Sequence, residues 1–182
     1  DFGPQIVAGY TIAIRVIVFT ILPSWGMANA AATLVGQNLG ANQPERAETS
    51  VWRAAFFNFL FLAIVAIVFF VFAGSIISWF NADPVTVATG VSCLRIVCLG
   101  YLFFAYGMVI SQSFNGAGDT LTPTLMNLVC FWAIEIPLAY LLAKQLGFGP
   151  DGVYISIAIS ESLLAVVGIV LFRRGKWKMK KV

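Results

Sequence analysis

Four ionisable side chains lie deep inside apolar stretches of this chain: Arg15, Arg95, Glu135 and Glu161. A charge that faces lipid near the middle of a membrane costs about 2.5–3.5 kcal/mol, so each of these groups should face protein or water. Each lies about ten residues from the predicted external end of its helix. At about 1.5 Å per residue, this places all four ~15 Å below the outer surface. We therefore expect two arginines and two glutamates in one layer, with charges that cancel.

Two interpretations of this layer remain open. In the first, Arg15 and Arg95 are structural ion-pair partners of the two glutamates, and the pairs clamp the helices together. In the second, one glutamate takes up a proton or a cation as the helices move. Glu135 is the favoured candidate for this role because Pro137 follows it in the same apolar stretch and an interior proline kinks a helix.

Further polar side chains occur within the apolar stretches, and three of them are candidates for lining a cavity: Tyr106, Gln112 and Asn127. With Glu135 and Glu161, they form the predicted substrate- or cation-binding set. The chain has no histidine, so the commonest metal ligand and the commonest general base are missing. We expect no metal site, no cofactor and no catalytic residue, because no nucleophile–base pair can be assembled.

The elements that must position these residues are five long apolar stretches. They cover about residues 5–35, 51–80, 85–114, 122–146 and 152–172. Each exceeds the ~20 residues that cross a ~30 Å hydrocarbon layer, and the chain is 60% hydrophobic and 10% charged. Backbone groups within a bilayer must be satisfied inside their own segment. The sequence therefore predicts an all-α, polytopic membrane helix bundle with five transmembrane helices.

Basic residues predict the orientation of this bundle. They gather beside the loop near residue 43 and in a tail at 175–182 that includes Lys180 and Lys181, whereas the loops near residues 82 and 148 carry few. Lys and Arg mark the cytoplasmic side, so we expect a cytoplasmic C-terminus in the inner (plasma) membrane. A basic cluster beside a span is typical of contact with anionic lipid, and nucleic-acid binding is not expected.

The loops between the stretches carry recognisable punctuation. Asp83 precedes Pro84, which is the pattern of an N-cap followed by proline in the first helical turn. Gly36–Ala41 and Asn115–Asp119 are both small and polar, and we expect both to form tight cytoplasmic turns.

These loop motifs resemble those of a known family. Gly36-Gln37-Asn38-Leu39-Gly40-Ala41 followed by Pro44-Glu45-Arg46-Ala47, then Asn115-Gly116-Ala117-Gly118-Asp119-Thr120, then Ile136-Pro137-Leu138-Ala139-Tyr140 resemble motifs of multidrug and toxic compound extrusion (MATE) transporters. The resemblance implies twelve helices in two lobes that export cationic or amphipathic compounds in exchange for Na⁺ or H⁺. On that basis, residues 1–174 are part of the C-terminal lobe, with helices 8–12, and the partner is the N-terminal lobe of the same protein.

The chain departs from the family pattern at one position. The family carries a cation-binding carboxylate on its tenth helix, but the matching position here falls near Phe104, and residues 91–114 contain no Asp or Glu. Either the coupling ion binds in another part of the protein, or Glu135 and Glu161 take over this role. Since the chain starts with Asp rather than Met, we expect a piece of a longer protein.

Two alternatives belong to other functional classes. A lipid-linked saccharide flippase of the same superfamily would need a strongly basic cavity for the pyrophosphate, and only Arg15 and Arg95 are available. A non-transporting membrane scaffold subunit would not need buried carboxylates.

Overall fold

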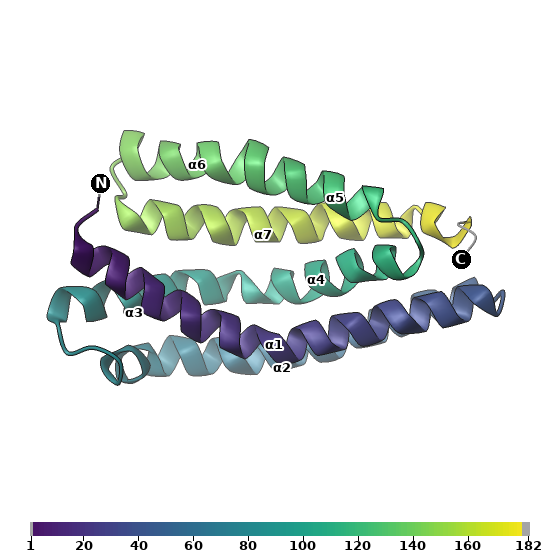
Figure 1. Ribbon diagram of the computed structural model, residues 1–182, viewed down its shortest axis with the longest axis horizontal. Coiled ribbons are helices and arrows are strands. Elements are labelled where there is room, and N and C mark those ends of the chain that lie inside the picture. Colours follow the sequence, from purple (N-terminus) through teal and green to yellow (C-terminus); the bar gives the residue numbers. More distant parts are fainter. Residues whose placement is uncertain (1, 180–182) are drawn as a thin grey trace.

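The computed structural model describes residues 2–179, and all of its regular structure is helical (Figure 1). The first half of the chain forms α1 (Pro4–Gly40), α2 (Pro44–Ser78), α3 (Pro84–Leu99) and α4 (Tyr101–Gly116). The second half forms α5 (Leu121–Asn127), η1 (Leu128–Glu135), α6 (Ile136–Tyr140), η2 (Leu141–Gln145), α7 (Pro150–Arg173) and η3 (Lys176–Met179). The helices lie lengthwise beside one another, and α7 lies between α6 and α4 (Figure 1).

The number of membrane spans agrees with the prediction. Among the described residues, four helical segments are long and apolar enough to cross a membrane: α1, α2, residues 121–145 and α7. The fifth span is the pair α3 and α4, which passes the same test as a unit but is bent by 58°. The structure thus agrees with the five predicted spans when this pair counts as one, whereas the single helix expected over residues 85–114 is broken at Gly100.

The bundle is held together by close contacts of small side chains. Gly100 lies against Ala158 and Gly107 lies against Ala165, so α4 and α7 meet at two points seven residues apart on each helix. Buried alanines occur all along α1 and α2, at positions that include Ala13, Ala28 and Ala55. Membrane helices associate by van der Waals packing, and small residues let their backbones approach closely. This packing fixes the rotation of α7 relative to the bend between α3 and α4.

Of the two glycine-containing motifs expected to form turns, only the second does so. The first is still helical through Gly40, and the loop that follows consists of residues 41–43 alone. Asn38 in this last helical turn is buried, and its amide donates a hydrogen bond to the carbonyl of Leu34 at 2.7 Å. Helix α4 ends at Gly116, so the second motif does form a turn as expected.

The start of α3 agrees with the sequence prediction. The carboxylate of Asp83 accepts hydrogen bonds from the backbone N–H and the hydroxyl of Thr86, both at 2.8 Å. These bonds satisfy donors that the first helical turn would leave open, and they hold the pKa of the Asp83 carboxyl below its ordinary value of 3.8. The predicted N-cap is confirmed.

Candidate functional site

The bend between α3 and α4 lies over a cavity inside the bundle. A Cβ atom added at Gly100 would lie 3.3 Å from the Cα of Ala158, so the bend presses the backbone of this span against α7. The cavity has a volume of about 130 Å³ and lies between α1, the bend and α7. Its walls are almost entirely apolar, and they are formed by Ile14, Ile17, Ile21, Val97, Gly100, Tyr101, Phe104, Ile157, Ala158 and Glu161.

Glu161 and Tyr101 bring the polar groups of this cavity. The Oε2 atom of Glu161 is buried and has no hydrogen-bond partner within residues 2–179, and the hydroxyl of Tyr101 is buried beside the Thr20 side chain. Tyr101 as a whole is 2% exposed. A buried carboxylate without a partner is strongly disfavoured while it is charged. This cavity is therefore a place where a proton or a small cation would be stabilised.

Glu135 lies close enough to Glu161 for the two carboxylates to repel each other when both are charged. It is partly buried and ends η1, a π-helical segment that comes directly before α6 and Pro137. Pro137 lacks the N–H that a regular helix needs, and π-helical turns lie on both sides of α6. Such turns are frequent at functional sites. The two glutamates predicted from the sequence are thus in one region of the bundle.

The two arginines are not part of this region. Arg95 is exposed, and its Nε atom donates a hydrogen bond of 3.1 Å to the carbonyl of Phe70. Its guanidinium group also lies over the ring of Phe70, 5.4 Å from the centroid. The Arg95 guanidinium therefore has its partners on Phe70 of α2, and the expected ion pair with a glutamate is not formed in the described part of the chain.

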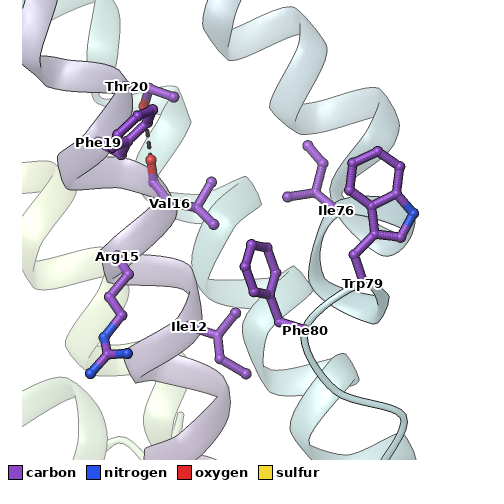
Figure 2. A pocket seen from close by; sticks show the side chains of 8 residues that line it. All are labelled: Ile12, Arg15, Val16, Phe19, Thr20, Ile76, Trp79 and Phe80. Carbon is purple, nitrogen blue, oxygen red and sulfur yellow. Dashed lines mark hydrogen bonds between the residues drawn. The ribbon is translucent and has the colours of Figure 1, made fainter.

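Arg15 is exposed as well and lines a different pocket, of about 460 Å³, between α1 and the end of α2 (Figure 2). In Figure 2 it extends along α1, with Phe80 and Trp79 on the other side of the pocket. Within residues 2–179 it forms no ion pair with a carboxylate. The Arg–Glu clamp expected from the sequence is therefore not formed among the described residues, because both arginines are exposed.

The remaining predicted site residues lie away from the cavity. Tyr106 packs against Phe59 and Trp52 of α2, with ring centroids 5.8 and 6.5 Å apart. Gln112 accepts a hydrogen bond of 3.0 Å from Asn115 in the last turn of α4, and Asn127 is exposed. The structure does not bring these three residues together with Glu161.

Sequence reasoning missed Tyr101 and the bend at Gly100. A glycine inside an apolar run is not a strong break signal, and an apolar span with one tyrosine has no reason to be singled out. Only the structure shows the pairing of Gly100 with Ala158, and Glu161 follows Ala158 by three residues and so lies on the same face of α7.

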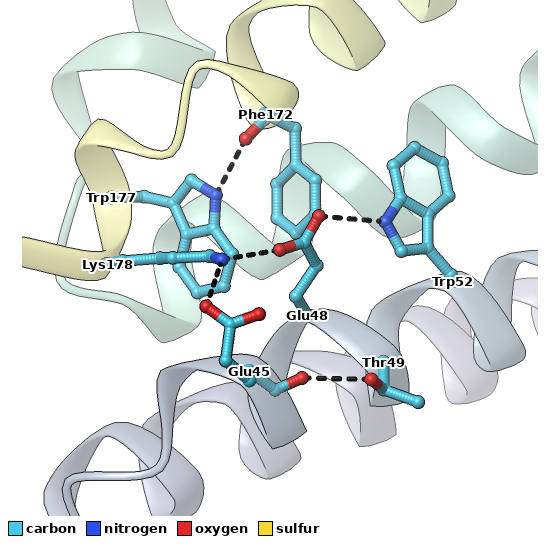
Figure 3. Close-up of polar contacts among 7 residues, drawn as sticks. All are labelled: Glu45, Glu48, Thr49, Trp52, Phe172, Trp177 and Lys178. Carbon is cyan, nitrogen blue, oxygen red and sulfur yellow. Dashed lines mark hydrogen bonds and ion pairs between the residues drawn. The ribbon is translucent and has the colours of Figure 1, made fainter.

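A second polar cluster joins the end of the chain to the start of α2 (Figure 3). The Lys178 amine forms ion pairs with Glu48 and, at 2.9 Å, with Glu45. These acceptors raise the pKa of Lys178 above its ordinary value of 10.5, with the hydrogen bond to Glu48 as the largest cause.

Next to it, Trp177 is 1% exposed, stacks on Phe172 at 4.6 Å and donates its indole N–H to the Phe172 carbonyl at 2.9 Å. This part of the basic tail is therefore bound to the bundle, whereas Lys180 and Lys181 lie outside the described residues.

Comparison with known proteins supports the fold and the class. The MatE family profile matches residues 1–141. Among curated proteins, the chain is 26% identical over 180 residues to a probable multidrug resistance protein NorM of Thermotoga maritima, covering 99% of this chain and 39% of that protein. It is 29% identical over 171 residues to another of that name from Mesorhizobium japonicum, covering 91% of this chain and 36% of the relative.

Solved structures give the same result. The chain superposes on the MATE transporter ClbM in complex with Rb⁺ with a TM-score of 0.89 and 26% identity, covering 98% of this chain and 42% of that one. An inward-facing multidrug resistance transporter matches with a TM-score of 0.83 at 23% identity, over 93% of this chain and 40% of that one, which supports the fold. The chain thus spans about two fifths of the length of its relatives.

Proposed function

Because the chain belongs to the MatE family, and its relatives include probable multidrug resistance proteins, we propose that it is part of a secondary active exporter. The whole protein would carry cationic or amphipathic compounds out of the cell in exchange for Na⁺ or H⁺. Residues 1–174 would form part of the C-terminal lobe and work together with an N-terminal lobe of the same protein.

The observation that carries this proposal is the enclosed carboxylate of Glu161 in a cavity of a membrane-spanning bundle. A carboxylate in such a place is stable when it holds a proton or a cation, and it becomes unstable when it loses that partner. Once Glu161 has lost that partner, the free energy of the protein is lower in a state in which water reaches the carboxylate. This difference links ion binding to a conformational change, as ion-coupled export requires.

The bend at Gly100 supports the same proposal. It lies at the midpoint of the span formed by residues 84–116, so it should lie near the middle of the membrane. Discontinuous helices near the midplane are where secondary transporters bind substrates and coupling ions, and rigid-body movement of the lobes then alternates access to the site.

The distribution of charge supports a location in the plasma membrane with the end at Lys178 in the cytoplasm. Arg46, Arg173, Arg174, Lys176 and Lys178 belong to the end that holds the loop at residues 41–43, and the opposite end carries Asp83 and Asp151 with Lys144. An excess of basic residues is typical of the cytoplasmic side.

The site offers less support for a lipid-linked saccharide flippase. That reading needs cationic side chains in the central cavity, but Arg15 and Arg95 are exposed and neither lines the cavity with Glu161. A scaffold role would predict that neither Glu135→Gln nor Glu161→Gln changes the resistance of cells to toxic cations.

The test uses the full-length protein in cells and in proteoliposomes. Glu161→Gln should abolish efflux of a fluorescent cation driven by an imposed Na⁺ or H⁺ gradient, while the amount of protein in the membrane stays the same. Glu135→Gln should reduce the efflux as well, because the variant removes the negative charge that repels the Glu161 carboxylate. Glu45→Gln is the matched control, since Glu45 is exposed in the first turn of α2 and Glu48 still forms an ion pair with Lys178. Full efflux in Glu161→Gln would refute the proposal.

A further inference from the structure

A polar face of α7 continues from the cavity to one end of the bundle. Asp151, Tyr154, Ala158 and Glu161 follow one another at intervals of three, four and three residues, so they share one side of the helix. Ala158 on this side contacts Gly100, which shows that the side faces the α3–α4 span. The end at Asp151 is opposite to the end at Lys178 (Figure 1).

The first group on this face is held in place by α3. The Ser92 hydroxyl donates a hydrogen bond of 2.6 Å to the Oδ1 atom of Asp151, and both residues are partly buried. Counted along α7 at about 1.5 Å per residue, the ten residues from Asp151 to Glu161 correspond to ~15 Å. Asp151 is thus the carboxylate on this face that lies nearest to the end of the bundle.

Between Asp151 and Glu161 lies a stacked pair of tyrosines. The rings of Tyr154 and of Tyr10 on α1 are parallel, with an interplanar angle of 1° and centroids 5.8 Å apart. Tyr154 is 2% exposed, and its hydroxyl has no hydrogen-bond partner among residues 2–179. A phenol ring excludes water and its hydroxyl can bind a passing ion, so this pair has the properties of a gate.

The groups lie near one another in series. Tyr154 lies within electrostatic range of Cys93, Asp151 and Tyr10. Tyr10 lies within the same range of Glu135, and Glu135 of Glu161. The titratable groups that face Glu161 from the neighbouring helices are Glu135 and Cys130 on η1 and Tyr101 on α4.

We propose that the coupling ion reaches Glu161 from the bundle end at Asp151, and that the stacked Tyr10 and Tyr154 rings close this route in the conformation described here. The inference that a coupling ion uses this route rests on the proposed function. The position of the route along α7 does not depend on it. The ligand is a proton or a small monovalent cation, for which carboxylate and hydroxyl oxygens are suitable partners.

Cys93 provides a direct test, because it is buried and lies within electrostatic range of both Tyr154 and Asp151. The full-length protein is prepared with Cys93 as its sole cysteine, and a water-soluble, positively charged methanethiosulfonate reagent is added to intact cells. Tyr154→Ala should increase the rate of Cys93 modification at least ten-fold. Tyr154→Phe keeps the stacked ring and should leave the rate low. Tyr140→Ala is the control, because Tyr140 is an exposed tyrosine on a neighbouring span.

A second measurement separates this inference from the proposed function. Asp151→Asn should raise the Na⁺ or H⁺ concentration that gives half-maximal efflux several-fold without changing the maximal rate, whereas Glu161→Gln should abolish the maximal rate. The two gradients, imposed separately, show which ion uses the route. An unchanged modification rate in Tyr154→Ala, or an Asp151→Asn variant with unaltered ion dependence, would overturn the inference. Full efflux in Glu161→Gln would overturn the proposed function alone, because the labelling of Cys93 does not depend on transport.

Discussion

Gly116 lies against the backbone carbonyl of Ala32, so that no side chain fits between α4 and α1 at this point. A Cβ atom added at Gly116 would overlap the Ala32 oxygen and would lie 2.7 Å from its Cα. Both residues belong to regular helices, and backbone atoms cannot move aside as the end of a long side chain can. The glycine in the second motif is therefore required by the packing of α1 and α4.

Replacing this glycine should weaken the bundle. We expect Gly116→Ala to lower the free energy of unfolding by about 1–3 kcal/mol, since overpacking at a close contact forces the backbones apart. Thermal unfolding of the purified full-length protein in detergent measures the effect. Gly74→Ala is the matched control, because a Cβ there meets nothing within 4 Å and alanine favours the helix. Equal melting temperatures for Gly116→Ala and the unaltered protein would contradict this account of the contact.

Tyr101→Phe should separate stability from activity. The variant removes a buried hydroxyl that interacts with the Thr20 side chain, so we expect the free energy of unfolding to fall by no more than about 1 kcal/mol. Ion-driven efflux should weaken several-fold, because the hydroxyl and Glu161 line the same cavity. Melting curves and proteoliposome transport are measured on the same preparation. A less stable variant with unimpaired transport would show that the hydroxyl has only a structural role.

The cap of α3 should make stability depend on pH in the acidic range. The folded-state pKa of Asp83 is below 3.8, so its contribution is complete above about pH 4 and is lost as the pH falls through the folded-state value. Asp83→Asn keeps a capping side chain but has no charge to lose. We expect its melting temperature to be lower than that of the unaltered protein at pH 7, and the difference to shrink as the pH falls below 3.8. A difference that is the same at both pH values would argue against a role for the charge.

Lys178 should contribute a salt-sensitive part of the stability. Lys178→Ala should lower the free energy of unfolding by about 0.5–1 kcal/mol at low ionic strength and by less in about 0.5 M NaCl, because the pairs are partly exposed. Its folded-state pKa is above 10.5, so the contribution is complete below that pH and is lost as the pH rises through the raised value. Lys176→Ala serves as the control, since Lys176 is exposed and makes neither of these ion pairs.

The sequence predicted the spans well and the rotation of the helices poorly, and one physical cause explains both. A stretch of more than 20 apolar residues has few alternatives to crossing a bilayer, and the stretches at residues 5–35 and 152–172 each lie within one long helix, α1 and α7. In lipid, however, both the packed side and the exposed side of a helix are apolar. No periodic signal then shows which side faces inward, and Arg15 and Arg95 were placed inside although both are exposed.

The nearness of the two glutamates has a cause that the sequence does contain. Glu135 and Glu161 lie on spans that are adjacent in the chain and joined by a short loop, so equal depth also brought them near each other. Their companion Tyr101 was not predicted. It depends on the bend at Gly100, which arises from the contact with Ala158 and has no local sequence signature.

The contact of η3 with α2 also bears on how the protein is made. The Trp177 and Lys178 side chains follow every span in the described chain, yet they dock beside Glu45 and Glu48, near the first loop (Figure 3). Synthesis runs from the N-terminus, so this connection can close only after the ribosome has delivered the last helix to the membrane. Until then, Glu45 and Glu48 lack their Lys178 partner, so the docking of η3 must follow the insertion of α7.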